Sequence, residues 1–307
     1  MKLGFLTACL PDVPLPEIAA WAQDHGYEAL EVAAFPRRHD RPHMATHLDA
    51  TSFDERAADK MRHLFDSHGL SLSSVAYYDN NLHPDAQVRK ANHEHLRACI
   101  DAAAAVECPT VGTFIGRDPS VSVVENLRQA EQIFPELVEY AGERGVRLIV
   151  ENCPMEGWHV DGYPGNLAYS PELWEWMFDL GLYLNYDPSH LIWLGIDPVA
   201  ALRPYVERVV HAQAKDAEVF PQRRNHYSVF GQVIDREDPW ASAWWRYRVP
   251  GLGDVDWRRV VDVLNEGGFT ACLSVEHEDP VWGGNDRQRT ETGLIIAQQT
   301  LRPLIPA

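Results

Sequence analysis

Short apolar runs alternate along this chain with longer stretches in which apolar residues recur every three or four positions. Apolar runs of this length, bounded by glycine or polar residues, predict buried strands, and the stretches between them predict amphipathic helices. Eight strand–helix units follow one another, and their strands are KLGFLTA (from Lys2), YEALEVAAF, LSLSSVAYY, PTVGTFIG, VRLIVEN, LYLNYD, RVVHAQAKD and FTACLSVEHED.

The regular alternation of strands and helices predicts a parallel sheet covered by helices. Eight units favour an α/β fold of the closed (β/α)8 TIM barrel type, with residues 1–307 forming one domain. A doubly wound open sheet is the alternative, but it usually has a glycine-rich turn after its first strand, and LTACLPDVP lacks one. In the helical stretch around Leu127 we expect Pro135 to kink the helix or to split it in two.

One connection is much longer than the others. Residues 217–256, after the seventh predicted strand, are rich in arginine, tryptophan and tyrosine. Loops of this length in a compact domain are usually functional. We therefore expect residues 217–256 to form an insertion over the mouth of the barrel, and WWRYR, Trp244 to Arg248, to be a lid or a substrate-binding arm.

Charge and cysteine content limit the partners and the compartment. A net charge of −18 disfavours binding to nucleic acid and to an anionic membrane. The five cysteines are far apart and form no CxxC pair, which is typical of reduced thiols in a cytoplasmic protein. No run approaches the roughly 18 apolar residues of a membrane span. The sequence thus favours a cytoplasmic protein with a small-molecule partner, and it is compatible with a homo-oligomer.

Polar side chains gather at the ends of the last four predicted strands. In a barrel the carboxyl ends of the strands meet at one mouth, where the active sites of barrel enzymes lie. Converging carboxylates repel each other, and a divalent cation relieves that repulsion. Carboxylate, amide and imidazole ligands suit Mn²⁺, the first candidate, and also Mg²⁺, Co²⁺ or Zn²⁺. The pattern predicts a mononuclear metal site at this mouth, among the strand-end residues Glu151, Asn152, Asp187, His190, His211, Gln213, Lys215, Asp216, Glu276, His277, Glu278 and Asp279.

The strand ends IVEN, NYDPSHL, HAQAKD and SVEHED, with the stretch VPGLGDVDW, resemble those of the xylose-isomerase-like TIM barrels, a group of sugar phosphate isomerases and epimerases. The resemblance covers essentially the whole chain. It implies that Glu151, Asp187 and Glu276 are metal ligands, and that Glu151 and Glu276 are also the two acid/base carboxylates. It further implies that His190 contacts a substrate oxygen or the metal-bound water.

The seventh strand departs from the family pattern. The family commonly has histidine two residues before the pair Lys215-Asp216, where this chain has Gln213, and His211 lies two residues further back. Residues two apart in a strand share a face, so both side chains point into the barrel. We expect Gln213 to offer its amide oxygen to the metal, with His211 one layer deeper. The alternative is that His211 itself is the ligand.

With that resemblance, the carboxylate pair predicts a metal-dependent isomerase or epimerase of a sugar, a polyol or a keto-sugar. Glu151 and Glu276 would move a proton at the carbon beside a carbonyl, through a metal-bound enediolate. The alternative is a metal-dependent lyase or hydratase that acts on a keto-sugar or an oxidised glycoside. An apurinic-site endonuclease is disfavoured by the acidic charge, and a non-catalytic binding barrel by the intact carboxylates.

Other residues are expected to bind the carbohydrate substrate. Trp158 could stack on a sugar face, or it could only cover the rim of the barrel. Lys215 could bind substrate hydroxyls, or it could form an ion pair with its neighbour. Arg246 or Arg248 could hold an anionic group, and the alternative for their segment is a contact between subunits.

Overall fold

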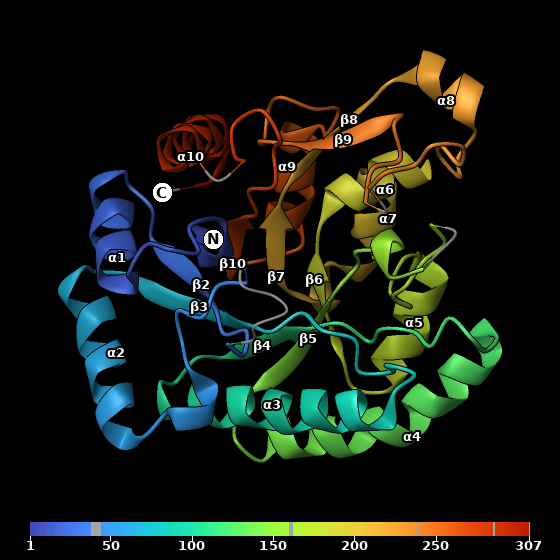
Figure 1. Ribbon diagram of the computed structural model, residues 1–307. Coiled ribbons are helices and arrows are strands. Elements are labelled where there is room, and N and C mark those ends of the chain that lie inside the picture. Colours follow the sequence, from blue (N-terminus) through green and yellow to red (C-terminus); the bar gives the residue numbers. More distant parts are fainter. Residues whose placement is uncertain (38–43, 160–161, 239, 285, 307) are drawn as a thin grey trace.

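The computed structural model describes residues 1–37, 44–159, 162–238, 240–284 and 286–306. Eight parallel strands form a closed barrel in the order β1-β10-β7-β6-β5-β4-β3-β2 (Figure 1), which confirms the predicted TIM barrel. The strands are β1 (Lys2–Leu6), β2 (Ala29–Ala33), β3 (Ser71–Ala76), β4 (Thr110–Thr113), β5 (Arg147–Glu151), β6 (Tyr183–Tyr186), β7 (Val209–Ala214) and β10 (Cys272–Val275).

Helices surround the barrel and follow most of its strands (Figure 1). Of the two alternatives expected at Pro135, a split of the helix is wrong, because α4 continues through this residue. The helices are α1 (Leu15–Asp24), α2 (Glu55–Ser67), α3 (Ala86–Ala105), α4 (Val123–Gly142), α5 (Pro171–Asp179), α6 (Pro188–Leu194), α7 (Pro198–Leu202), α9 (Trp257–Glu266) and α10 (Arg287–Leu301).

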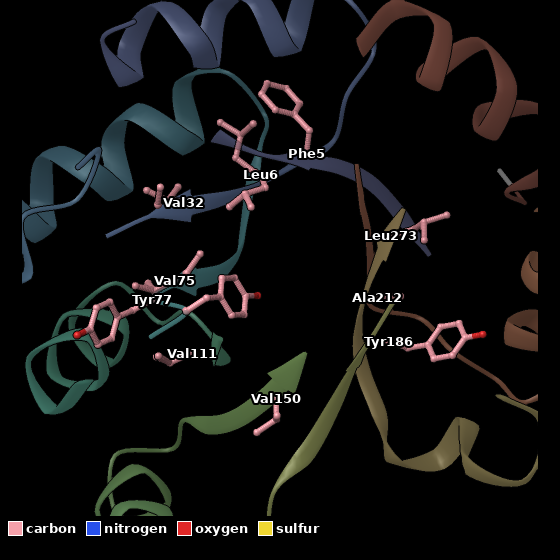
Figure 2. Close-up of a cluster of buried hydrophobic side chains, with 14 of the residues drawn as sticks. Phe5, Leu6, Val32, Val75, Tyr77, Val111, Val150, Tyr186, Ala212 and Leu273 are labelled. Carbon is pink, nitrogen blue, oxygen red and sulfur yellow. The ribbon is translucent and has the colours of Figure 1, made fainter. Parts of the chain in front are cut away.

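Apolar side chains on the outer faces of the strands pack against the helices and form the main core. Phe5 on β1, Val150 on β5 and Leu273 on β10 belong to this layer, and each is at most 1% exposed. Figure 2 shows them pointing away from the barrel axis. The apolar core thus lies between the strands and the helices. The inner faces of the strands are therefore free to carry polar residues.

The inside of the barrel is strongly polar, unlike the branched apolar layers that usually fill a TIM barrel. Glu31 on β2 accepts hydrogen bonds from Tyr78 Oη at 2.5 Å and from Ser274 Oγ on β10 at 2.9 Å. Asn185 on β6 donates to Tyr78 Oη at 2.8 Å and accepts from His211 Nδ1 on β7 at 2.9 Å. A buried polar group is tolerated when it is hydrogen-bonded, and these bonds cross the barrel from strand to strand.

The long connection after β7 contains regular structure. β8 (Asp216–Val219) and β9 (Trp245–Arg248) pair antiparallel, with α8 (Pro221–Tyr227) between them in sequence. Figure 1 shows this hairpin and α8 at one end of the barrel, beside α6. Trp245 stacks on Trp193 of α6 with ring centroids 4.5 Å apart, and Trp244 is fully buried. Tryptophan packing therefore attaches the insertion to the barrel.

The structure also bears on the expected absence of a membrane span and on the state of the cysteines. Within the described ranges, no helix is long and apolar enough to cross a membrane. All five cysteines are free thiols, and four of them are buried.

Candidate metal and active site

Three carboxylates meet at the mouth of the barrel. Glu151 is the last residue of β5, Asp187 follows β6, and Glu276 follows β10. One oxygen from each lies within 4.8 Å of the others, and all three side chains are buried. The sequence placed these residues at the ends of three predicted strands, and the closed barrel brings the ends of β5, β6 and β10 together around β7.

Asp187 is oriented by the start of α6. The chain is extended at Asp187, and Pro188 opens the helix, where a missing N–H costs nothing. Asp187 Oδ1 accepts from the Ser189 amide at 2.8 Å as an N-cap. The Asn152 side chain also bonds to the main chain of Asp187, through 2.7 Å and 2.8 Å contacts. These bonds leave Oδ2 to face the other carboxylates.

His190 lies behind two of the carboxylates. Its Nε2 is 3.0 Å from Glu151 Oε1 and 3.2 Å from Asp187 Oδ2, and its Nδ1 is 3.3 Å from Tyr247 Oη. The side chain is fully buried, and it is not among the residues that line the cavity above the carboxylates. In this arrangement His190 holds Glu151 and Asp187 in place.

Lys215 reaches into the middle of the carboxylate group. Its Nζ is 2.7 Å from Glu276 Oε2 and 3.1 Å from Glu278 Oε2. The same atom is 3.3 Å from Asp187 Oδ2 and 3.8 Å from Glu151 Oε1. The ammonium therefore supplies positive charge to all four of these acids.

Burial and charge set the protonation of this group. Burial raises the pKa of Glu276 well above its usual range, and the nearby Glu151 carboxylate raises it further. Burial also raises the pKa of Glu151, against the opposing effects of Lys215 and His190. At Asp187 burial alone would raise the pKa, but the same two positive groups outweigh it and lower the pKa. The three carboxyl groups thus differ in pKa. Asp187 is the ionised carboxylate, and Glu151 and Glu276 are the two that can hold a proton.

Gln213 and His211 occupy different levels of the barrel. Gln213 Nε2 lies 3.4 Å from both oxygens of Glu31, and Gln213 Oε1 is buried without a hydrogen bond in the described chain. His211 Nε2 bonds to Ser73 Oγ at 3.1 Å, and His211 lines a separate cavity of about 570 Å³ beside Arg147, the first residue of β5. Both His211 nitrogens already have partners inside the protein.

A cavity of about 520 Å³, here called the mouth cavity, opens above the carboxylates. Its floor includes Glu151, Lys215 and Glu276, and Trp158 lies in its wall, edge-on to Phe114 at 5.5 Å. This volume lies in the usual range for small-molecule sites, roughly 300–1,000 Å³. Tyr247, from the WWRYR segment, and Glu278, from the end of the eighth predicted strand, also line it, as does Trp240, which sequence reasoning did not single out.

The two arginines of β9 are held by carboxylates of the protein. Arg246 pairs with Glu218 at 2.7 Å, and Arg248 bonds to Glu218 at 2.7 Å and to Asp279 at 2.9 Å. Neither arginine lines the mouth cavity. Arg248 is largely buried in its pairs, so the geometry gives it a structural part in the hairpin.

Asp216, the neighbour of Lys215, points away from the mouth cavity. Its carboxylate accepts hydrogen bonds from the amides of Ala217, Gly251 and Val255 and from the Trp257 indole, at 2.9–3.0 Å. The lysine and the aspartate are therefore not partners. Consecutive residues of an extended chain point to opposite faces, which accounts for the difference.

The residues at the mouth fit a divalent cation. Asp187 Oδ2 and Gln213 Oε1 are buried and accept no hydrogen bond within the described chain. Asp187 offers one oxygen within 4.8 Å of those of Glu151 and Glu276, and such a hard oxygen donor set suits Mg²⁺, Mn²⁺ or Zn²⁺. Lys215 now shares these carboxylates, so a bound cation would have to share or replace its contacts.

Comparison with known proteins agrees with the barrel fold. Residues 19–300 match the family model described as xylose isomerase-like TIM barrel. The chain belongs to the xylose isomerase-like TIM barrel family. It is 32% identical over 299 residues to YfiH, an uncharacterized protein of Bacillus subtilis, and the match covers 91% of this chain and 93% of YfiH. It is 33% identical over 102 residues to inosose dehydratase of Clostridium tetani, 32% of each chain.

Two solved structures illustrate the likeness in fold. A zinc-bound IolI protein superposes with a TM-score of 0.68 at 18% identity, covering 99% of this chain and 96% of IolI. D-psicose 3-epimerase of Clostridium cellulolyticum, solved with D-tagatose, gives a TM-score of 0.67 at 13% identity over the full length of both chains. At these identities the likeness concerns the fold alone.

Proposed function

We propose that this member of the xylose isomerase-like family is a divalent-metal-dependent isomerase or epimerase of a sugar, a polyol or a keto-sugar. The observation that carries the proposal is the pair Glu151 and Glu276, which share the floor of the mouth cavity with Lys215 between them. Burial raises the pKa of both carboxyl groups, which favours their holding a proton for transfer. Proton transfer at a carbon beside a carbonyl needs two such groups.

The chain's own residues have separate tasks in this proposal. One of Glu151 and Glu276 takes the proton from the substrate carbon, and the other returns a proton from the opposite side or to the adjacent carbon. His190 keeps Glu151 oriented through the 3.0 Å contact. Lys215 can donate a hydrogen bond to a substrate oxygen from the cavity floor. Trp158 covers one wall and helps to exclude water.

The proposed cofactor is one divalent ion held by Glu151, Asp187, Gln213 and Glu276. When bound, such an ion polarises a carbonyl as a Lewis acid. Mn²⁺ is the first ion to test, followed by Mg²⁺, Co²⁺ and Zn²⁺. The partly unsatisfied oxygens of Asp187 and Gln213 support this assignment, and they favour Gln213 over His211, whose nitrogens are engaged elsewhere.

A dehydratase is the second candidate, and a specific observation favours it. The sequence matches inosose dehydratases over part of the chain, including the one from Clostridium tetani. Elimination of water begins with the same removal of a proton beside a carbonyl, and it differs only in the fate of the neighbouring hydroxyl. A lysine ammonium on the cavity floor could protonate that leaving hydroxyl.

The test uses the protein loaded with Mn²⁺ and a panel of keto-sugars and keto-polyols in deuterated water. NMR of the recovered sugars measures how much deuterium each has incorporated. Incorporation of deuterium with an epimer or isomer as product supports the first candidate, and loss of water supports the second. Glu276→Gln should abolish incorporation, while Glu139→Gln, on the exposed face of α4, should leave it unchanged. Exchange that persists in Glu276→Gln would contradict the assignment of Glu276.

A further inference from the structure

A second cavity adjoins the mouth cavity and shares a wall with it. This outer cavity has a volume of about 680 Å³ and lies between the inserted hairpin and the segment after β10. Three residues line both cavities, namely Trp240, Tyr247 and Glu278. The two cavities therefore border each other at these three side chains.

The position of Trp240 is set by a close contact across the mouth. A Cβ atom at Gly157, in the loop after β5, would lie 2.2 Å from two carbons of the Trp240 indole. Only glycine leaves room for the indole at this point, so the ring lies directly against the Gly157 backbone. Trp240 is still 45% exposed. Its remaining surface is available to a ligand.

A further contact joins the same two segments. The rings of Tyr163, in the loop after β5, and Phe230, in the insertion, meet edge to face with centroids 5.7 Å apart. The loop and the insertion thus meet at two separate places above the barrel. The wall that carries Trp240 is built by both segments.

The lining of the outer cavity indicates an uncharged ligand with apolar faces. Its aromatic surface comes from Phe220, Trp240 and Trp245. Its charged residues balance, because Arg223 and Arg246 are positive and Asp238 and Glu278 are negative. Arg246 is already neutralised by Glu218 at 2.7 Å. A phosphate would find little net positive charge here, whereas a pyranose ring could place its C–H face on an aromatic ring and its hydroxyls on the polar groups.

We propose that the outer cavity is a subsite for a second sugar ring, so that the substrate is a glycoside or disaccharide with one oxidised ring. This inference rests on the proposed function for the mouth cavity, where the oxidised ring would react between Glu151 and Glu276. The second ring lies against Trp240, with Phe220 and Trp245 on the far side. The insertion after β7 then determines the substrate, while the carboxylates determine the chemistry.

The experiment measures binding without any reaction. Saturation-transfer NMR and calorimetry compare one-ring probes, methyl α- and β-D-glucopyranoside, with two-ring probes, maltose and cellobiose, on the metal-loaded protein. We expect at least one two-ring probe to bind about tenfold more tightly than its one-ring counterpart, as a desolvated aromatic contact typically contributes. Equal affinity of both probe types, or no binding of two-ring probes at millimolar concentration, would overturn the proposal.

Two variants locate the effect and one controls for it. Trp240→Ala removes the indole, and Gly157→Ala displaces it by adding the missing Cβ. Both should abolish the advantage of the two-ring probe, and the one-ring affinity should fall less because Trp240 is only one of the residues that line the mouth cavity. Ile234→Ala removes an 80% exposed apolar side chain from the same insertion that lines neither cavity, so it should change neither affinity. If Trp240→Ala lowered the affinity of both probe types equally, Trp240 would not be the residue that binds the second ring.

Failure of this inference is separable from failure of the proposed function. If two-ring probes bind through Trp240 but no keto-sugar exchanges deuterium, the subsite stands and the proposed chemistry falls. If keto-monosaccharides exchange deuterium and two-ring probes gain nothing, the chemistry stands and the outer cavity is not a sugar subsite.

Discussion

Lys215 Nζ lies 2.7 Å from the Glu276 carboxylate and 3.3 Å from that of Asp187, within the group of acids that fits a metal ion. Burial alone would lower the pKa of Lys215, but the surrounding carboxylates outweigh it and raise the pKa well above its usual range. The lysine is therefore charged, and it partly neutralises the site before any cation binds. A metal ion and this ammonium depend on the same oxygens.

We expect Lys215→Met to destabilise the metal-free protein and to increase its stabilisation by metal. Removing one partner of a buried ion pair costs about 3–5 kcal/mol, because the remaining charges are uncompensated. Thermal melts in EDTA and in Mn²⁺ measure both effects. Lys60→Met, on the exposed face of α2, is the control. A variant that melts like the wild type in EDTA would show that Lys215 does not neutralise the group.

Asp187→Asn should lower metal affinity at least about tenfold, as loss of a charged ligand oxygen does. Asparagine remains a good N-cap, so α6 should keep its first turn and the melting temperature should fall little. Asp197→Asn makes the same change at the N-cap of α7 and should not affect metal content. Elemental analysis after dialysis measures the metal content of each variant. A full equivalent of metal in Asp187→Asn would show that Asp187 is not a ligand.

Asp216→Ala should be among the most destabilising single changes at the mouth. It leaves three buried amides and an indole N–H without their common acceptor, at a cost of about 2–5 kcal/mol. Urea denaturation measures the free energy of unfolding. Asp254→Ala, which removes one bond to the Val219 amide, should cost much less. Similar losses in the two variants would contradict the anchoring role of Asp216.

Stability should fall as the pH drops below about 6.5, the ordinary pKa of histidine. Burial lowers the pKa of His95, as it does for His47 and His93, so these side chains stay neutral in the folded state. The unfolded chain then binds more protons, and each such group contributes a loss of at most about 1.4 kcal/mol per pH unit until its folded pKa is reached. Urea denaturation between pH 7.5 and 5 would reveal the loss.

His95→Gln tests this assignment. Glutamine can still donate to the Ala34 carbonyl, which His95 Nε2 contacts at 2.7 Å, but it does not titrate. The variant should show a shallower dependence of stability on pH, while His63→Gln, on an exposed position of α2, should keep the wild-type slope. An unchanged slope in His95→Gln would mean that other groups cause the acid sensitivity.

Much of the fold followed from the sequence because buried parallel strands form apolar runs that local patterning exposes. Glu151, Asp187 and Glu276 were found because each stands where such a run ends. A proline inside a helical pattern is less decisive, as α4 shows, because packing along both sides can hold a helix together through Pro135.

Other residues at the mouth cavity could not be predicted, because they reach it through long-range contacts that leave no local sequence pattern. Trp240 and Tyr247 belong to a segment without clear periodicity, so their approach to the mouth cavity could not be read from spacing. Glu31 did leave a signal, since a carboxylate within the run YEALEVAAF must find buried partners. Strand alternation could also have separated Lys215 from Asp216, because neighbours in an extended chain face opposite sides.

The Asp216 carboxylate holds the two ends of the insertion together, which affects how the insertion can evolve. By bonding to residues 217, 251, 255 and 257 it closes the base of the insertion, independently of what lies between the two strands of the hairpin. Closing a longer flexible loop adds only about 0.6 kcal/mol for each doubling of its length. Residues 220–244 can thus be lengthened, shortened or exchanged as a cassette, and new specificities can be acquired without altering the barrel or its carboxylates.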